Sequence, residues 1–435
     1  MTDGVTYLVW HDLAGTSRTR GVPTANLSSM TATGLGWACA GQALTAFGSI
    51  VDNPWGPMDE VRQVPDMEAQ FTLPPSRGHG AFRAVICDTS TSDGALWDCC
   101  GRGFLRKALD ALKAETGLTL MASFEHEFLL TGEGYVPSPG FTLAAAMQKS
   151  EFLDDLNTAL SHAGVRPATL EPEYGDGQYE VSCKPDIGLR AADTCLIARE
   201  TIREVARRHG LTASFTPKPA ADAVGNGAHV HMSLVDEDGR NHTWDPSGPM
   251  ELSEVAQKFA HGILASVDGL VAITAPSPVS YYRLAPHSWS CGYRAIGLQN
   301  REAALRVTPG IGDDAAKAKG HNLEFRPCDG TASPYLVLGA LIMAGLAGIR
   351  SGGGKLTEIT CDPLDMTDAE REAAGVTRLP TSLEAALQAF QDDPVTATMF
   401  SDDMRDVYLG IKRWEIEAAA AMEGDQVFHA YRTAY

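Results

Sequence analysis

The chain has 435 residues, 44% hydrophobic and 21% charged, a composition typical of a globular protein large enough for two or more domains. Its 55 acidic and 35 basic side chains give a formal net charge of −20, which disfavours binding to nucleic acid or to an anionic membrane. The amino-terminal segment lacks the features of a signal peptide, no apolar run is long enough to span a membrane, and nine cysteines show no paired or metal-type spacing. We therefore expect a cytoplasmic protein.

The first part of the chain is expected to form a small, strand-rich domain. It is rich in Gly, Thr and Pro and contains short alternating stretches such as residues 6–10. The pattern then changes, because Leu105, Ala108 and Leu112 recur at helical spacing up to Gly117. We therefore predict two domains, residues 1–103 and residues 104–435.

The second part mixes helices with strands. Helices are predicted over residues 150–162 and 193–209, each followed by a glycine, and strand signals lie between them. Because helix and strand signals alternate without a regular βαβ rhythm, the pattern indicates the α+β class. The sequence contains no GxGxxG or GxxxxGK[ST] phosphate loop, so any nucleotide must be held by another device.

Two carboxylates are expected to project side by side from one predicted strand. Residues 118–130 are typical of a strand, and its period of two places Glu125 and Glu127 on the same face. A solvated strand face would explain one such pair without any function.

Three later segments repeat this alternation of polar and apolar residues. The polar side chains are Gln178 and Glu180, preceded by Glu173 and Asp176 in a Gly-rich turn, then His229, His231 and Ser233, then Glu324 and Arg326. Stripes of carboxylate, imidazole and guanidinium groups on four strands favour a sheet that curls around a shared polar cavity.

The residue types in these stripes indicate a site for metal and phosphate. Carboxylates with one or two imidazoles favour Mg²⁺ or Mn²⁺, whereas zinc would need a third histidine or a thiol at a suitable spacing. Phosphoryl transfer also needs cations that position and neutralise phosphate. The chain supplies Arg283, Arg301, Arg306, Lys319 and Arg326.

Taken in order, these residues resemble the glutamine synthetase family over nearly the whole chain. The matching motifs are Asp12-Leu-Ala-Gly15, Val64-Pro65-Asp66, Glu125-His-Glu127, Gly177-Gln178-Tyr-Glu180, Lys218-Pro219, Asn226-Gly-Ala-His229-Val-His231, Tyr282-Arg283-Leu284, Asn300-Arg301, Glu324-Phe-Arg326-Pro-Cys-Asp329 and Ser333-Pro334-Tyr335-Leu336. The resemblance implies an amino-terminal β-grasp domain and a catalytic domain whose curved antiparallel sheet, with flanking helices, forms half of a bifunnel. It also implies a homo-oligomer of stacked rings, a dodecamer in the family, with active sites between subunits.

The resemblance further implies a ligase that uses ATP to activate L-glutamate as a γ-glutamyl phosphate, which a small amine then attacks. By position, one metal would be bound by Glu127, Glu173 and Glu180, and a second by Glu125, His229 and Glu324. Nucleotide or phosphate contacts would come from His231, Ser233, Arg306 and Lys319. Glutamate would be held by Asn226, Gly227, Arg283 and Arg326, with Arg301 on the transferring phosphate.

Three departures from the family concern the amine. The family's Phe-Asp-Gly-Ser-Ser loop is replaced by Phe47-Gly48-Ser49-Ile50, the acidic residue expected six positions after Arg283 is replaced by Trp289, and Val279 replaces an Asn. This less polar amine site favours an alkylamine such as methylamine, as in the family's γ-glutamylmethylamide synthetases. Glu173, or else Asp176, would accept the amine proton.

Other functions remain open at this stage. The chain could be a glutamine synthetase that uses ammonia, with Asp52 in place of the missing aspartate, or a ligase for another amine. It could also be a structural or regulatory relative without activity, although all six expected metal ligands are present.

Overall fold

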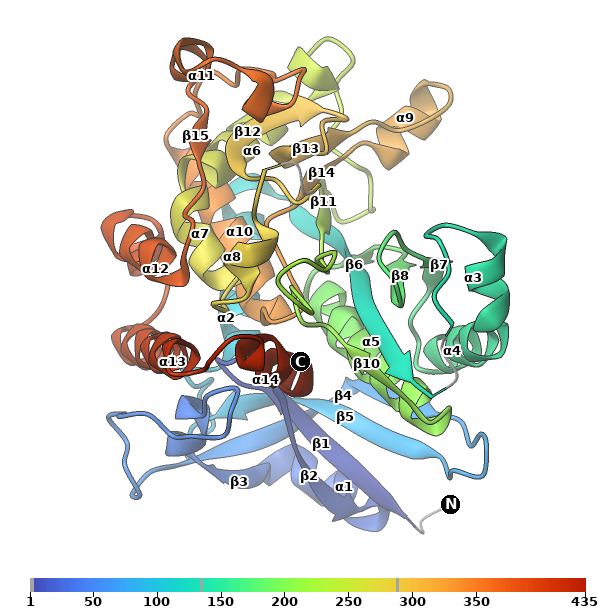
Figure 1. Ribbon diagram of the computed structural model, residues 1–435. Coiled ribbons are helices and arrows are strands. Elements are labelled where there is room, and N and C mark those ends of the chain that lie inside the picture. Colours follow the sequence, from blue (N-terminus) through green and yellow to red (C-terminus); the bar gives the residue numbers. More distant parts are fainter. Residues whose placement is uncertain (1–3, 134–135, 287–288) are drawn as a thin grey trace.

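The computed structural model describes residues 4–133, 136–286 and 289–435, and it contains two sheets surrounded by helices (Figure 1). The smaller sheet, formed by the amino-terminal strands, lies below the larger one in Figure 1, and the carboxy-terminal helices return to the region between them. This mixed architecture confirms the α+β prediction.

The smaller sheet has five strands in the order β2-β1-β5-β4-β3. Central β1 runs parallel to β5, the other pairs are antiparallel, and α1 packs against β4, which is the predicted β-grasp arrangement. A small core of Leu8, Val22, Leu27, Val85 and Cys87 fills the space under α1. The elements are β1 (Val5–His11), β2 (Ser17–Pro23), η1 (Thr24–Asn26), α1 (Leu27–Thr33), β3 (Leu35–Ala38), η2 (Cys39–Ala43), β4 (Glu60–Leu73) and β5 (Phe82–Ser90).

The larger sheet has ten strands, with the order β15-β12-β13-β14-β11-β6-β8-β7 and with β9 and β10 also paired to β6. Among the strands of the described ranges, only β12 and β13 pair in parallel, so the expected antiparallel sheet contains one parallel pair. Its strands are β6 (Thr119–Gly132), β7 (Pro167–Pro172), β8 (Gln178–Cys183), β9 (Asp186–Ile187), β10 (Leu211–Ser214), β11 (Val230–Val235), β12 (Tyr293–Leu298), β13 (Ala303–Thr308), β14 (Asn322–Phe325) and β15 (Thr377–Arg378).

Helices flank this sheet. They are α2 (Gly101–Thr116), α3 (Leu143–Gln148), α4 (Ser150–His162), α5 (Leu189–Arg208), α6 (Glu254–Ala265), α7 (Val267–Thr274), α8 (Ser280–Arg283), α9 (Asp314–Gly320), α10 (Pro334–Arg350), α11 (Asp368–Ala374), α12 (Leu383–Asp392), α13 (Asp402–Ala420) and α14 (Gln426–Ala434), with 3-10 turns η3 (Pro249–Glu251), η4 (Pro363–Asp365) and η5 (Thr396–Thr398). Within the described parts of the chain, no helix combines the length and apolar character needed to cross a membrane.

The predicted helices occur, with one difference at a helix start. Gly117 ends α2 in the left-handed conformation with φ 72°, and α4 has the predicted bounds. Helix α5 begins at Leu189 rather than at Asp193, with Gly188 as its N-cap, so Asp193 lies inside the helix. Its buried carboxylate instead accepts hydrogen bonds from Arg102.

Ion pairs of the buried Arg102 connect the smaller sheet to helices α2 and α5. Arg102, at the start of α2, contacts Asp66 on β4 at 2.7 Å, Asp88 on β5 at 2.7 Å and Asp193 on α5 at 2.9 Å. The division of the chain at residues 103 and 104 stays a prediction. It falls within α2, just after this arginine.

A second connection involves the carboxy-terminal helices. On α13, the buried Lys412 ammonium lies 2.9 Å from the buried Glu415 carboxylate. The other oxygen of Glu415 accepts a hydrogen bond of 3.1 Å from the Ala46 amide in the amino-terminal region. This pair therefore joins α13 to the amino-terminal region.

Helices α6 and α10 cross at a glycine contact. A Cβ atom on Gly262 would lie 2.1 Å from the Ala344 carbonyl oxygen, and one on Gly348 would lie 2.1 Å from that of Lys258. Only glycine permits this approach. The contact holds α6 against the buried α10, beneath the sheet that carries the candidate site.

Candidate active site

Strand β6 presents alternate side chains to its two faces, as predicted. Phe124, His126 and Phe128 are buried on one face, whereas Glu125 and Glu127 are partly exposed on the other. The alternation follows from the pleat of a strand. It places the two carboxylates side by side, above a core that includes His126 and Phe215.

Neighbouring strands extend this polar face across the sheet. Glu127 lies opposite Glu180 on β8, while Glu324 on β14 lies between His231 on β11 and Arg306 on β13. In Figure 1 these strands follow one another through the middle of the molecule. The stripes that the sequence predicted on separate strands therefore belong to one sheet.

Glu125, His229 and Glu324 form the first cluster on this face. Each can offer a ligand atom such that all three atoms lie within 4.8 Å of one another. His229 is not part of β11, which begins at Val230, but its carbonyl oxygen accepts a hydrogen bond from the Glu125 amide at 3.0 Å. This bond continues the pairing beyond the strand and brings the imidazole to the carboxylates.

Glu127, Glu180 and Glu173 form the second cluster. The Gly227 amide donates a hydrogen bond of 2.8 Å to Glu127, and the Ser182 hydroxyl donates one of 2.8 Å to Glu180. Burial, and then the neighbouring carboxylates, raise the pKa of Glu180 to about 9 and that of Glu173 to about 7. These carboxylates therefore repel one another when they are ionised, and a bound cation would offset the repulsion.

The imidazoles shift the charge balance at the first cluster. Burial opposes the ionisation of Glu125, but hydrogen bonds from His229 and His231 outweigh it and hold the pKa of Glu125 well below its usual value. Burial lowers the pKa of His229, and the Arg326 charge adds to this effect. For His231, hydrogen bonding and attraction to Glu125 outweigh burial and raise its pKa to about 9.

Two buried arginines and a third that is partly buried border the clusters. Arg306 and Arg326 both contact Glu324, the former at 2.7 Å, and Arg283 lies 3.2 Å from the His229 ring. Within the described ranges, Arg283 Nη1, Arg306 Nε and Arg326 Nε have no hydrogen-bond partner. Because a buried N–H group is costly to leave unpaired, these atoms suit an anionic substrate.

Other residues named from the sequence lie apart from this buried set. Asp176, Arg301 and Lys319 are exposed, and 69% of the Trp289 side chain is accessible. Ser233 is buried, but its hydroxyl donates to the His321 carbonyl oxygen at 3.2 Å. The expected carboxylates and Arg283, Arg306 and Arg326 are therefore together in the structure. The expected nucleotide contact Lys319 is exposed instead, and Ser233 already has another hydrogen-bond partner.

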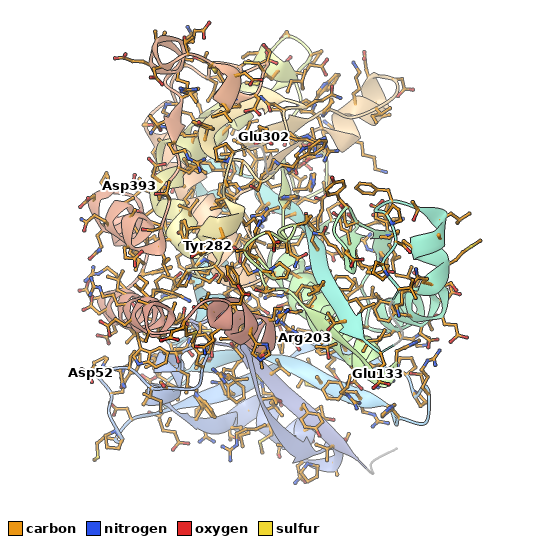
Figure 2. The ribbon with its side chains drawn as sticks, in the orientation of Figure 1. Asp52, Glu133, Arg203, Tyr282, Glu302 and Asp393 are labelled. Carbon is orange, nitrogen blue, oxygen red and sulfur yellow. The ribbon has the colours of Figure 1, made fainter. Side chains whose placement is uncertain are left out.

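Trp289 is anchored through its backbone. Its amide donates to Glu302 at 3.0 Å, and its carbonyl oxygen accepts from Arg326 at 2.7 Å. With Arg301 and Glu302 it lines a cavity of about 510 Å³ that also includes Cys361 and Asp362. Figure 2 shows Glu302 in the upper half of the molecule, whereas Asp52 lies far below, beside the smaller sheet. Asp52 therefore does not reach this cavity within one chain.

Two amide side chains hold the site and were not assigned a role from the sequence. Gln178 donates to Glu127 at 3.2 Å and to Asn226 at 3.0 Å, and Asn322 lies 2.8 Å from the His231 ring. Each amide lies two residues before a carboxylate of an alternating stripe, Glu180 or Glu324, and this position was the sequence feature that could have indicated a role. Their hydrogen-bond partners lie on other strands, so the sequence of one strand could not predict them.

The donor groups fit a hard divalent cation. Carboxylate oxygens dominate both clusters, and a single imidazole, that of His229, joins the first. Mg²⁺ and Mn²⁺ prefer such oxygen-rich sets. The described residues contain no further group of three ligands like that of Glu125, His229 and Glu324.

Comparison with known proteins extends these observations. Residues 98–431 match the family model for the glutamine synthetase catalytic domain. The chain is 35% identical over 441 residues to gamma-glutamylpolyamine synthetase GlnA3 from Streptomyces coelicolor, covering 98% of this chain and 93% of that protein. It is 30% identical over 375 residues to glutamate–isopropylamine ligase from a Pseudomonas species, covering 82% and 78%. A crystal structure described as a novel glutamine synthase homolog superposes with a TM-score of 0.92 at 36% identity, covering 100% and 99%.

Proposed function

Because this chain belongs to the glutamine synthetase family and is an ATP-dependent ligase acting on glutamate, we propose that it forms a γ-glutamyl amide from L-glutamate and a small alkylamine, methylamine. One observation carries this proposal. The two carboxylate clusters lie on one sheet face and are bordered by arginines whose buried N–H groups lack acceptors among the described residues.

Mg²⁺ or Mn²⁺ is the proposed cofactor. Glu127, Glu173 and Glu180 would hold one cation, and the second would be held by Glu125, His229 and Glu324. When bound, these cations would neutralise the negative charge that accumulates between carboxylates and phosphates. His231 and Asn322 would orient Glu125 from behind.

In the first step, a γ-carboxylate oxygen of glutamate attacks the γ-phosphorus of ATP, and ADP leaves. Arg283 and Arg326 would hold the glutamate, with the Asn226 side chain and Gly227 beside them, because each arginine has a buried N–H group without an acceptor among the described residues. Arg306 and exposed Arg301 would contact phosphate oxygens, and His231, Ser233 and Lys319 are the other proposed nucleotide contacts. Such positioned cations supply most of the catalysis in phosphoryl transfer.

In the second step, the amine nitrogen attacks the acyl carbon, the carbon–oxygen bond to phosphate breaks, and the amine loses a proton. We assign that proton to Glu173. Burial raises its pKa to about 7, so that its carboxylate can accept a proton near neutral pH. Asp176 is the weaker choice, because its side chain is exposed on the same turn.

The identity of the amine rests on two residues. The aspartate that ammonia-using members of the family carry is missing from the stretch Phe47-Gly48-Ser49-Ile50, and Trp289 stands where they carry an acidic residue. An indole attracts an alkylammonium through its π face and its apolar surface. Trp289 lines the cavity of about 510 Å³ together with Arg301. This shared cavity supports a role for the indole beside the phosphate that Arg301 would contact.

A longer amine is the second candidate. The Trp289 cavity is much larger than a methyl group requires, and it is lined by the carboxylates of Glu302 and Asp362. A diamine or polyamine could direct a second ammonium group towards these acids. The similarity to a protein named a gamma-glutamylpolyamine synthetase supports this alternative.

Phosphate release with a panel of amines tests these proposals. The purified protein would receive ATP, Mg²⁺ and glutamate with ammonium, methylamine, isopropylamine or 1,4-diaminobutane, and product mass would identify the amide. We expect the highest kcat/KM with methylamine, whereas a preference for the diamine would select the second candidate. A preference for ammonium would indicate a glutamine synthetase, and no amide with any amine would reject ligase activity.

We also propose that the protein assembles into stacked rings, with a dodecamer as the expected size. Large apolar side chains are strongly exposed on distant parts of the chain. The exposed fraction is 84% for Met58, 71% for Tyr174 and 91% for Ile311. Such surfaces commonly pack against other subunits. Sedimentation velocity would detect the assembly, and a monomer at micromolar concentration would reject it.

A further inference from the structure

Gln178, at the start of β8, is the side chain at which three parts of the candidate site meet. It is 4% exposed. Its Oε1 atom accepts a hydrogen bond of 2.9 Å from the Gly175 amide. Its Nε2 atom lies 2.8 Å from the Gly225 carbonyl oxygen, 3.0 Å from Asn226 Oδ1 and 3.2 Å from Glu127 Oε2. One amide group therefore contacts the turn before β8, the segment before β11 and a proposed metal ligand on β6.

The backbone fixes the direction of these hydrogen bonds at both ends. A backbone N–H group can only donate, so the oxygen of Gln178 faces Gly175 and its NH2 group faces the carbonyl oxygen of Gly225. On the other side, the Asn226 Nδ2 group donates to the Thr216 carbonyl oxygen at 2.8 Å, so Asn226 presents its Oδ1 atom to Gln178. This chain of hydrogen bonds therefore has one arrangement, and it needs both the donor and the acceptor of a glutamine.

The NH2 group of Gln178 faces more acceptors than it has hydrogen atoms. An amide nitrogen carries two hydrogens, and the two shorter contacts, to Gly225 and Asn226, account for both. The contact with Glu127 is the longest of the three, and the same carboxylate oxygen accepts a shorter hydrogen bond of 2.8 Å from the Gly227 amide. Gln178 therefore holds residues 225 and 226 more firmly than it holds the metal ligand.

The two segments that Gln178 joins also pack against each other. A Cβ atom on Gly175 would lie 2.8 Å from Gln178 Oε1 and 3.0 Å from the Cβ atom of Val224. One on Gly225 would lie 2.8 Å from Arg283 Cγ, so only glycine permits this approach. A displacement of residues 224–227 would therefore change the surroundings of Arg283, one of the arginines proposed to hold glutamate.

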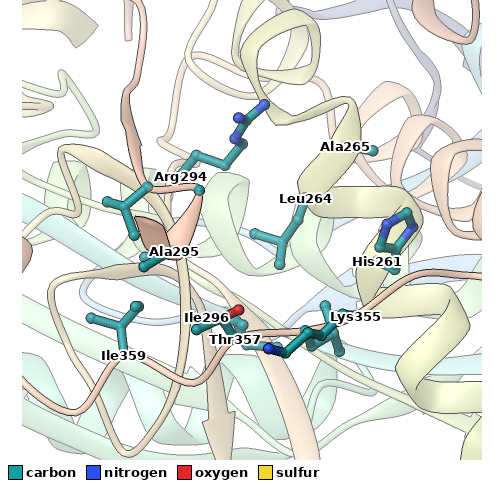
Figure 3. Close-up of a pocket in the computed structure, with 13 residues that line it drawn as sticks. His261, Leu264, Ala265, Arg294, Ala295, Ile296, Lys355, Thr357 and Ile359 are labelled. Atoms are coloured by element: carbon teal, nitrogen blue, oxygen red, sulfur yellow. The ribbon is translucent and has the colours of Figure 1, made fainter. Parts of the chain in front are cut away.

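Polar side chains do not meet in this way at the cavity of about 280 Å³ between α6, β12 and residues 355–359 (Figure 3). Figure 3 shows the Arg294 guanidinium and the Lys355 ammonium at opposite ends of that cavity. Within the described ranges, no hydrogen bond joins the polar side chains of its wall. The network around Gln178 is therefore a property of the candidate active site.

We propose that Gln178 is a positioning residue for L-glutamate, an inference that rests on the proposed function. It holds residues 225–227, which are proposed to contact glutamate, against the turn of residues 173–177, which carries the proposed proton acceptor. The separation between the bound glutamate and the Glu173 carboxylate then depends on one amide group. A displacement of about 1 Å can lower a reaction rate by about a hundredfold, so this separation matters for the attack of the amine.

Ligand binding by Gln178→Met tests the proposal. Methionine has nearly the length of glutamine but has neither its N–H donors nor its carbonyl acceptor. Titration calorimetry would give the dissociation constants of MgADP and, with MgADP present, of L-glutamate, and electron paramagnetic resonance would give that of Mn²⁺. We expect about tenfold weaker binding of L-glutamate, because the network is lost, and affinities for MgADP and Mn²⁺ within about twofold of wild type.

Gln42→Met is the matched control. Gln42 is also 4% exposed, and its Nε2 atom donates to the Cys99 carbonyl oxygen at 2.9 Å, outside the candidate site. This variant should keep the wild-type affinity for L-glutamate. Unchanged L-glutamate affinity in Gln178→Met, or equal weakening of all three ligands, would overturn the positioning role.

A second variant serves if Gln178→Met does not fold. Gln178→Glu keeps the size and the acceptor for the Gly175 amide, but it replaces the NH2 group by an oxygen that faces three acceptors. L-glutamate should again bind about tenfold more weakly, and wild-type affinity would reject the role. Because these affinities are read without turnover, the positioning role can fail in a protein that forms the amide, and amide formation can fail in a protein with the expected affinities.

Discussion

Glu127 on β6 and Glu180 on β8 lie directly opposite each other in the sheet, although both are carboxylic acids. Like charges in this position destabilise a sheet. The pKa of Glu180 is raised to about 9 by its burial and then by repulsion from Glu125 and Glu127. The protein therefore keeps an unfavourable pair that a divalent cation would turn into an attractive one.

Replacing either acid should abolish ligation. Glu127→Gln and Glu180→Gln each remove a ligand charge while keeping the side-chain size, so kcat/KM should fall by at least about a hundredfold. Without metal, Glu180→Gln should melt at or above the wild-type temperature, because folding of the variant no longer has to protonate and bury a carboxylate. Exposed Glu133→Gln at the end of β6 is the control, with wild-type kinetics expected. Wild-type rates in either cluster variant would remove these residues from the metal site.

Removal of metal should have two separate effects. A chelator should stop phosphate release, which Mg²⁺ or Mn²⁺ should restore, and addition of metal should raise the melting temperature. At a hundred times the dissociation constant, the stabilisation would be about 2.7 kcal/mol. In His229→Ala, which loses the only imidazole of the first cluster, this stabilisation should shrink. Full activity in excess chelator would contradict the assignment.

Arg326→Lys should lose most activity with little loss of stability. Arg326 is 2% exposed and contacts both Glu324 and the Trp289 carbonyl oxygen. A lysine keeps the charge near Glu324 but cannot reproduce the planar fork. We expect kcat/KM for glutamate to fall by about two orders of magnitude. Arg350→Lys, at an exposed pair with Glu115, is the matched control, and equal kinetics in both variants would place Arg326 outside the substrate site.

Trp289→Ala should reduce the preference for alkylamine. A cation–π contact contributes roughly 0.5 to 2 kcal/mol, and burial of one methyl group adds about 0.8 kcal/mol. Together they would favour methylamine over ammonium by roughly tenfold to a hundredfold in kcat/KM. The variant should lose most of this ratio, measured by steady-state kinetics. Ile311→Ala, at a side chain that is 91% exposed, should leave it unchanged. An unaltered ratio in Trp289→Ala would exclude the indole from amine selection.

Lys412→Met should destabilise the protein, although Lys412 is not part of the candidate active site. The variant leaves the buried Glu415 carboxylate with its Ala46 contact but without its cation, which costs about 3 to 5 kcal/mol. Lys412→Met combined with Glu415→Gln should recover most of this loss, because the buried charge is gone and the amide oxygen still accepts from Ala46. Melting curves of the two variants compare them directly. If the double variant were no more stable than the single one, the buried charge would not be the cause.

Local patterns predicted much of the fold. The alternation over residues 118–130 placed Glu125 and Glu127 on one face, and glycine ended α2 where expected, because strand pleat and helix capping depend on neighbouring residues. The start of α5 was misplaced because the helix begins after Gly188, and Asp193 lies within it, where its buried carboxylate pairs with Arg102, a residue distant in sequence. Local sequence gives no sign of such a partner.

The candidate site was predicted as a set of residues but not as a geometry. Which stripe lies beside which depends on the strand order, and the pairing of Glu324 with both His231 and Arg306 follows only from the order β13-β14-β11. Likewise, the hydrogen bonds from Gln178 to Glu127 and Asn226 depend on β8 lying beside β6.

Strand β6 also constrains how the protein can be made. Its edges are paired by β8 and β9 on one side and by β10 and β11 on the other, and all four partners come later in the chain. During synthesis, Glu125 and Glu127 therefore leave the ribosome on a strand with both edges unpaired, until residues up to Val235 have followed. Long-range pairing of this kind is slow and exposes strands to aggregation. We therefore expect the strand that carries the proposed metal ligands to need protection from aggregation while the chain is being made.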